Sequence, residues 1–199
     1  MGLTPVPEGH LATVVTTLEM RERPRLAPMP PSELRLVRWE QPTLPRYRTL
    51  FARIGAPWLW YSRLVMADAA LAKIIHDPKV SVYAAVDRAG IEVGFLELDH
   101  RHDGVCELAY FGLVPERVGR GDGRWLMANA LMLGWGREVT RMWVHTCTLD
   151  HHRALDFYRR SGFTAFRRTM ETFPDPRIAG ILPPETAPQI PLLAPASRR

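Results

Sequence analysis

The sequence has few cysteines, almost no lysine and no long apolar run. Its two cysteines, Cys106 and Cys147, can form one bridge at most. This excludes a disulfide-stabilised scaffold, and we expect both residues to be reduced thiols. No apolar run approaches the ~20 residues that cross a bilayer, and the first residues lack the charged start, apolar centre and cleavage site of a signal peptide. We therefore expect a cytoplasmic protein that does not bind a membrane.

The composition that remains is that of one compact domain. The chain has 199 residues, of which 46% are hydrophobic and 24% are charged. This apolar content excludes a wholly disordered chain, and the length is sufficient for a substantial core. No internal repeat is visible.

The basic residues are almost all arginine. Lysine and arginine together number 26 against 21 acidic residues, but Lys73 and Lys79 are the only lysines. Guanidinium groups suit phosphate, so this excess is compatible with nucleic acid, an anionic cofactor or simple solubility. No nucleic-acid reading motif and no aromatic and basic strand platform is present. We therefore expect no nucleic-acid partner.

Proline-rich segments set the two ends of the chain apart from the middle. Residues 23–31 and the stretch from Phe173 onward are rich in proline and lack helical periodicity, which is typical of extended or linker segments. We expect an N-terminal extension (1–32), a central domain (33–170) and a proline-rich tail (171–199). The β-branched segment 11–20 indicates an additional strand, although its pairing partner cannot be predicted.

The central region alternates strand and helix patterns and predicts an α+β fold with a mixed, mostly antiparallel sheet. Three strands in succession between Ser81 and Val114 favour antiparallel hairpins. We expect Asp150 to cap the last helix at its start and Gly162 to end it. The expected strands are 34–37, 81–86, 94–99, 105–114, 142–148 and 163–169, and the expected helices are 44–54, 68–76, 123–137 and 151–160.

A glycine-rich turn, Val118–Arg124, lies between a strand that ends near Val114 and an amphipathic helix. Glycines allow backbone N–H groups to converge on an anion, and the start of the next helix adds a partial positive charge. The spacing is neither that of a Rossmann fingerprint nor that of a Walker loop. The turn is therefore a candidate phosphate site of another kind.

A second motif follows further along the chain. The block Trp143–Asp150 precedes Ala154, Phe157, Tyr158, Gly162 and Phe163, in the spacing Ala-x-x-Phe-Tyr-x-x-x-Gly-Phe. Together, the two motifs resemble those of the GNAT N-acetyltransferase superfamily, and the resemblance extends over residues 34–169.

The chain departs from the family pattern at two positions. The polar first residue of the acetyl-CoA motif is replaced by Val118, and His151 stands where the family commonly has asparagine. Gly121 and Gly123 match the two glycines of the motif. Three nearby arginines are candidates to replace the missing side chain at the phosphates: Arg117, Arg120 and Arg124.

The resemblance implies a splayed pair of central strands with acetyl-CoA between them. It also implies main-chain pairing of pantetheine near Phe111–Val114 and pyrophosphate binding by the amides of Gly119–Arg124. The implied cofactor-binding residues are Leu113, Val114, Val118, Gly119, Arg120, Gly121, Asp122, Gly123 and Arg124.

Catalytic roles also follow from the resemblance. Glu107, on the central strand, takes the position of a general base that deprotonates the amine directly or through water. Tyr158 takes the position of a general acid for the CoA thiolate, and a main-chain N–H near Leu113 or Val114 would polarise the carbonyl. The alternative interpretations are an ion-paired surface glutamate and a buried helix aromatic.

Two other groups of residues are candidates for binding. Trp58, Trp60 and Tyr61 fall where the family forms its acceptor wall, although core packing or a dimer contact explains them as well. A histidine-rich run with one cysteine lacks regular zinc spacing, so we expect no metal site. This run consists of His145, Cys147, Asp150, His151 and His152.

The sequence thus predicts an acetyl-CoA-dependent N-acetyltransferase that acts on a primary amine, either a small molecule or a peptide, within a ternary complex. A non-catalytic acyl-CoA-sensing or interaction module on the same fold is the alternative hypothesis, because Val118 and His151 depart from the family pattern. A homodimer is possible, since the extra strand and the tail offer material to cover a sheet edge.

Overall fold

The computed structural model describes residues 2–25 and 27–193. Residue 1 and residue 26 of the expected N-terminal extension, and residues 194–199 of the expected tail, lie outside the described residues. The domain limits therefore stay predictions. Within the described ranges, no helix has the length and apolarity needed to span a membrane.

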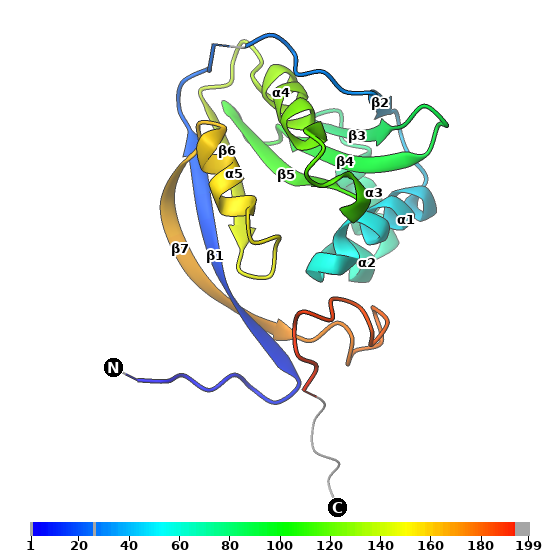
Figure 1. The fold of residues 1–199 in the computed structure, drawn as a ribbon, viewed down its shortest axis with the longest axis vertical. Coiled ribbons are helices and arrows are strands. Elements are labelled where there is room, and N and C mark those ends of the chain that lie inside the picture. The colour runs from blue at the N-terminus through cyan, green and yellow to red at the C-terminus, as the bar shows by residue number, and fades with distance from the viewer. Residues whose placement is uncertain (1, 26, 194–199) are drawn as a thin grey trace, which may run out of the picture.

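The fold is built on one seven-stranded sheet in the order β2-β3-β4-β5-β6-β1-β7 (Figure 1). All neighbouring strands are antiparallel except β5 and β6, which are parallel. This arrangement confirms the predicted α+β class with a mixed, mostly antiparallel sheet. The strands are β1 (His10–Met20), β2 (Arg35–Trp39), β3 (Val80–Val86), β4 (Glu92–Asp99), β5 (Val105–Leu113), β6 (Arg141–Cys147) and β7 (Thr164–Pro174).

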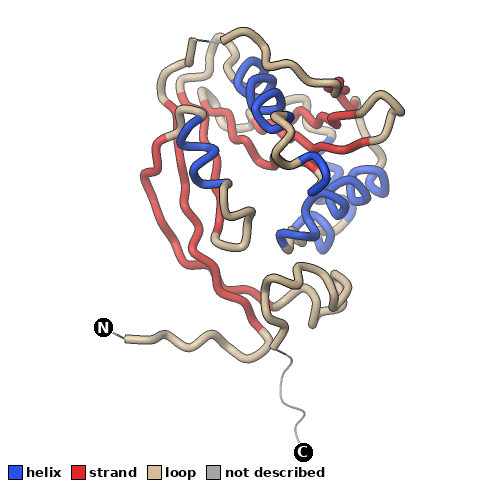
Figure 2. Tube along the Cα trace, in the orientation of Figure 1, coloured by secondary structure: helices blue, strands red, loops and turns tan. Residues whose placement is uncertain are grey.

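Helices lie on both sides of the sheet and differ in places from the predicted ranges (Figure 2). The expected helix 123–137 ends at Gly134, and the expected helix 151–160 begins at Ala154. The segment 56–65, which carried no helix prediction, contains two short helical turns. The helices are α1 (Leu44–Gly55), η1 (Ala56–Trp58), α2 (Ser62–Val65), α3 (Asp68–Ile75), η2 (Pro115–Arg117), α4 (Asp122–Gly134) and α5 (Ala154–Arg160).

The core forms where α1 packs on the central strands. The Thr43 side chain accepts a hydrogen bond from the Arg46 N–H and so caps the helix start. Phe51 meets the ring of Phe95 at 6.3 Å and that of Tyr110 at 4.9 Å, both edge to face. These contacts fix α1 against β4 and β5, the strands that carry the candidate site.

The N-terminal strand β1 lies between β6 and β7, which follow it by more than 100 residues in the sequence (Figure 1). Thr17, for example, is opposite His145 on β6 and Arg167 on β7. The additional strand predicted from the sequence is therefore an internal strand of the sheet. Only the tertiary structure identifies its partners, because none of them is close in the chain.

The tail after β7 folds back on the domain instead of extending as a linker. Arg177 is almost completely buried, forms an ion pair of 2.7 Å with Asp175, and donates hydrogen bonds to main-chain carbonyls further along the tail. Leu182 and Ala187 pack on Leu59 in a small second core. The described residues 175–193 contain no helix, and they form a compact loop around the buried Arg177 instead of the extended or linker segment predicted from the proline content.

Candidate active site

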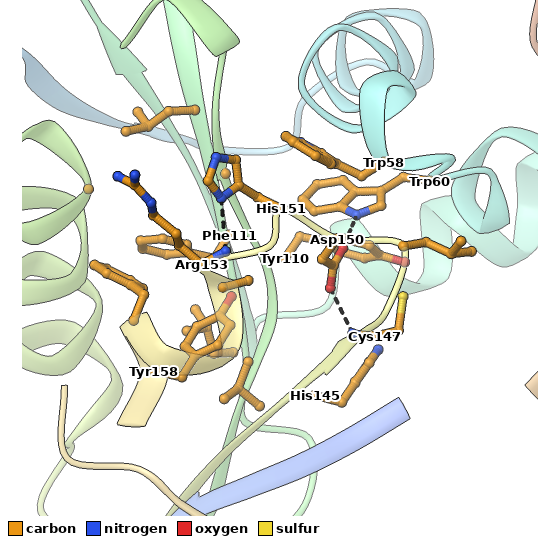
Figure 3. Close-up of a pocket in the computed structure, with 18 of the residues that line it drawn as sticks. Trp58, Trp60, Tyr110, Phe111, His145, Cys147, Asp150, His151, Arg153 and Tyr158 are labelled. Carbon is orange, nitrogen blue, oxygen red and sulfur yellow. Dashed lines mark hydrogen bonds between the residues drawn. The ribbon is translucent and has the colours of Figure 1, made fainter. Parts of the chain in front are cut away.

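A cavity opens where the two parallel strands diverge. Strands β5 and β6 pair only as far as Glu107 opposite Trp143, and a bulge then leaves Ala109 of β5 without a partner on β4. Beyond this point the strands enclose a cavity of about 550 Å³ (Figure 3). The splayed pair implied by the resemblance is therefore present, and residues of both strands line the cavity.

The glycine-rich turn forms one end of this cavity. Gly119 and Gly121 have φ values of +86° and +90°, the left-handed region in which a side chain is strained, and Gly121 caps α4. Among the described residues, the amides of 119–123 have no hydrogen-bond acceptor. Free amides at the start of a 13-residue helix make a site for an anion.

Only some of the charged residues near the turn line the cavity. Arg117 and Arg124 line the cavity, as do Val118, Gly119, Gly121 and Gly123, whereas Arg120 and Asp122 do not. Asp122 is buried, where its carboxylate accepts a hydrogen bond of 2.7 Å from Ser32 and lies 3.6 Å from Arg117. Asp122 therefore braces the turn from behind, and Arg117 and Arg124 are the arginines available to a ligand.

The hydrogen bonds at the end of β5 show which main-chain N–H, that of Leu113 or that of Val114, is free to polarise a carbonyl. The Val114 N–H donates to the Val93 carbonyl at 2.9 Å, and Val114 does not line the cavity. Successive residues of an antiparallel strand point their amides to opposite sides, so the Leu113 amide faces away from β4 and toward the gap. Sequence patterns do not distinguish the two amides, because the choice depends on the pairing of β4 with β5.

Tyr158 lies in the wall of the cavity on α5. Its ring is buried between Phe111, Phe157 and Phe163, with ring centroids 5.8–6.2 Å away, and this burial raises its pKa well above the usual value. Its hydroxyl has no hydrogen-bond partner among the described residues. A neutral phenol with a free hydroxyl at a cavity wall can donate a proton to a bound group.

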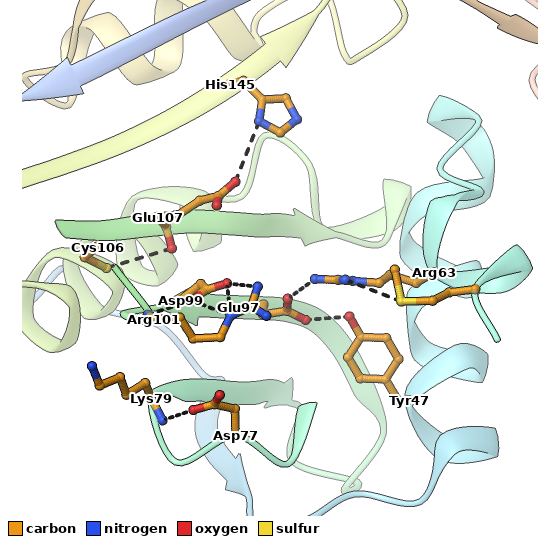
Figure 4. A network of polar contacts seen from close by, with 11 residues as sticks. Tyr47, Arg63, Asp77, Lys79, Glu97, Asp99, Arg101, Cys106, Glu107 and His145 are labelled. Carbon is orange, nitrogen blue, oxygen red and sulfur yellow. Dashed lines mark hydrogen bonds and ion pairs between the residues drawn. The ribbon is translucent and has the colours of Figure 1, made fainter. Parts of the chain in front are cut away.

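Glu107 lies at the fork of the two strands, beside the cavity and outside its lining (Figure 4). Its pKa is raised to about 7, first because burial removes water from the carboxylate and then because the charges of Asp99 and Glu97 repel it. Across the gap lies His145, whose Nδ1 is 4.0 Å from Oε1 of Glu107. A carboxylate with this pKa exchanges a proton near neutral pH.

Three aromatic residues singled out in the sequence form the opposite end of the cavity. Trp58, Trp60 and Tyr61 all line it, and Figure 3 shows the two tryptophans on the side away from Tyr158. The Trp60 Nε1–H donates to Asp150 at 3.4 Å, and the Tyr61 ring stacks on Phe173 at 5.2 Å. The wall is thus held in place by the turn after β6 and by β7.

Asp150 does not cap the last helix, contrary to the prediction. Its Oδ2 accepts hydrogen bonds from the Thr146 hydroxyl at 2.7 Å and from the Cys147 N–H at 2.9 Å, so it closes the turn after β6. Helix α5 begins later, after Arg153, and no side chain caps it. Gly162 does follow the helix end with a φ of +101°, as predicted.

Several cavity residues were not found from the sequence. Glu171 and Phe173 come from β7, and Arg153 and His151 come from the loop before α5. Neither Glu171 nor Arg153 has a partner of opposite charge among the described residues. No local pattern marks Glu171 and Phe173, because they reach the cavity through the pairing of β7 with β1.

Metal binding is not supported by any cluster in the described part of the chain, where no group of three or more His, Cys, Asp or Glu side chains is arranged to hold an ion. Both cysteines are free thiols. In the histidine-rich run, Asp150 and Cys147 are hydrogen-bonded to each other through the main chain, and His151 stacks on His152 at 4.3 Å.

These observations agree with a comparison of the sequence with family models. The model of the acetyltransferase (GNAT) family matches residues 35–163, which is more than half of the chain. The chain belongs to the GNAT acetyltransferase family. No curated protein matches the sequence.

Solved structures of GNAT proteins share the fold. A GCN5-related N-acetyltransferase from Sphaerobacter thermophilus is 15% identical with a TM-score of 0.59, and the match covers 84% of this chain and 52% of that one. The chain thus spans about half the length of that protein. A GCN5-related N-acetyltransferase from Kribbella flavida is 18% identical, with a TM-score of 0.52, and the match covers 86% of this chain and 63% of that one.

A third similar structure is AAC(6')-Iy in complex with the bisubstrate analogue CoA-S-monomethyl-acetylneamine. It is 21% identical with a TM-score of 0.54, and the match covers 69% of this chain and 95% of that chain. At these identities the similarity concerns the fold.

Proposed function

We propose that this GNAT chain transfers an acetyl group from acetyl-CoA to a primary amine, directly and within a ternary complex. The observation that carries the proposal is that one cavity joins an anion-binding helix start to an aromatic wall. The two ends suit two different ligands, and the point where the strands diverge lies between them. Direct transfer needs both ligands in one space.

The charges of the cavity support this division. Arg117 and Arg124 lie at the glycine turn, and Arg153 joins them from the loop before α5. Guanidinium groups and free helix amides suit the phosphates of CoA. At the other end, Glu171 lies without a basic partner among the described residues and close to the Tyr61 ring. A carboxylate beside aromatic faces suits a protonated amine.

The chemistry requires a neutral amine, a donor for the oxyanion and a proton for the thiolate. An alkylamine with a pKa near 10 is mostly protonated at neutral pH, so a base is needed. We assign the Glu107 carboxylate to the deprotonation of the amine, directly or through an intervening group, the Leu113 amide to the oxyanion and Tyr158 to the sulfur as its acid. Acetyl-CoA supplies the thioester, and the chain supplies position and proton transfer.

The test is the release of free CoA thiol from acetyl-CoA in the presence of a pooled panel of polyamines, amino acids, aminoglycosides and short peptides. We expect amine-dependent release, after which the pool is divided to find the acceptor. Tight acetyl-CoA binding without any release above the protein-free control would contradict the proposal in favour of a non-catalytic acyl-CoA-binding module.

A further inference from the structure

Glu107 and His145 face each other across the point where the central strands part (Figure 4). Glu107 is the last residue of β5 paired with β6, opposite Trp143. His145 follows Trp143 by two residues, so the side chains of Trp143 and His145 lie on the same face of β6. The Nδ1 of His145 is 4.0 Å from Oε1 of Glu107. A bridging water or a small rotation of the ring converts this distance into a hydrogen-bonded contact.

The two residues differ in their access to the cavity. The imidazole of His145 lines the cavity, and 49% of its side chain is exposed. Glu107 is outside the lining, with 24% of its side chain exposed. An amine in the cavity therefore contacts the histidine before it can reach the carboxylate.

We propose that His145 is the catalytic residue that takes the proton from the attacking amine, and that Glu107 is a positioning residue that orients the imidazole and stabilises its charged form. The inference rests on the proposed function and makes its proton transfer more specific. With Nδ1 directed at Glu107, the Nε2 atom of the ring is left for the amine. The histidine also connects the buried carboxylate to solvent.

The groups around the pair favour this division of roles. Burial and two neighbouring carboxylates make ionised Glu107 costly, and a protonated imidazole in front of it would offset that cost. Arg63 and Arg101 act in the opposite direction, because their positive charges lower the pKa of Glu107 and favour its ionised form. The titratable and charged groups that face Glu107, besides His145, are Glu97, Asp99, Arg63, Arg101, Cys106 and Tyr110.

The proton transfers of the proposed reaction balance. The neutral amine attacks the carbonyl carbon of the thioester, and Nε2 of His145 takes the proton that the nitrogen loses as the C–N bond forms. The C–S bond breaks, and the sulfur takes the hydroxyl proton of Tyr158. His145 then returns its proton through solvent to the tyrosine, so that amide and free thiol are the only products.

The first experiment requires no acceptor. The tautomers of the histidine rings are read from their ¹⁵N NMR signals in the wild-type chain and in Glu107→Gln, and His145→Ala identifies the His145 signals. We expect the neutral ring of His145 to carry its proton on Nδ1 in the wild-type chain and to lose this preference in Glu107→Gln, because the variant removes the carboxylate opposite Nδ1. The same tautomer in both chains would overturn the pairing, whether or not the chain acetylates an amine.

The second experiment measures turnover. With an amine that the wild-type chain accepts, we expect His145→Ala to lower kcat/KM for the amine about 100-fold or more, to leave the Kd for acetyl-CoA unchanged, and to regain activity with added imidazole. We expect Glu107→Gln to lose less activity than His145→Ala and to shift the acid limb of the pH profile to lower pH. His152→Ala, an exposed histidine outside the cavity lining, is the matched control.

The outcomes separate the two proposals. Full activity of His145→Ala in a chain whose wild type is active would overturn the relay and leave acetyl transfer standing. Absence of turnover in the wild type itself, with acetyl-CoA bound and the whole amine panel offered, would contradict acetyl transfer and with it the catalytic role of His145.

Discussion

The two ends of the cavity are built in different ways. The end that suits CoA comes mostly from one short segment, the turn at 117–124 and the start of α4. The end that suits the amine combines residues from η1, the loop after β6 and the edge strand β7, and the tail supports it from outside. Function at the first end depends on local backbone conformation, and function at the second depends on long-range packing. Variants should therefore separate the two ends cleanly.

The largest effect is expected from Gly121→Val. A valine is strained at φ +90° and carries its side chain at the start of α4, where the free amides converge. We expect the Kd for acetyl-CoA, measured by calorimetry, to rise by about 100-fold or more. Gly90→Val is the control, since Gly90 has a φ of +82° in an exposed turn away from the cavity. Equal loss of binding in both variants would show that strain alone is responsible.

The next effect is expected at Tyr158, between the two ends. Tyr158→Phe keeps the buried ring and removes the hydroxyl, so binding at both ends should persist while the thiolate loses its proton donor. We expect kcat to fall by about 100-fold, with less than about a twofold change in the Kd for acetyl-CoA. An unchanged kcat would remove Tyr158 from the mechanism.

A third prediction concerns stability at the point where the strands diverge. Because burial raises the pKa of Glu107 to about 7, the folded chain keeps a proton that the unfolded chain has lost above about pH 4.5. The free energy of unfolding should fall as pH rises through this window, by about 3 kcal/mol at most from this residue.

Glu107→Gln tests this dependence, because a neutral amide has no charge to bury. Relative to wild type, we expect the variant to be more stable at pH 8 than at pH 5, as measured by urea unfolding. Glu116→Gln, at an exposed glutamate on η2, controls for the loss of one carboxylate. The same slope in Glu107→Gln and wild type would exclude Glu107 as its source.

The smallest effect is expected at the aromatic wall. Trp58 touches His151, with ring centroids 5.4 Å apart, and is partly exposed to the cavity. We expect Trp58→Ala to raise the KM for the amine by about tenfold, with the Kd for acetyl-CoA unchanged. Phe166→Ala, which removes an exposed ring on β7 outside the cavity, is the control. A loss of acetyl-CoA binding in Trp58→Ala would contradict the separation of the two ends.

The segments with strong local signals were the ones that the sequence predicted well. The hairpins between Ser81 and Val114, the glycine turn and the end of α5 at Gly162 depend on turn residues and alternation within a few positions. Asp150 was misassigned because a helix cap and a turn-closing carboxylate look alike in sequence. Its partners, Thr146 and the Cys147 amide, are close in the chain, but only the turn geometry selects them.

By itself, the sequence determined the family, the mixed sheet and the position of the glycine-rich turn, because these depend on periodicity, glycine conformation and a short motif. The tertiary structure alone decided that β1 lies between β6 and β7, that Arg177 draws the tail into a compact loop, and that His145 stands between Glu107 and the cavity. Each of these depends on contacts between distant segments, and such contacts are set by packing and by the satisfaction of buried charge.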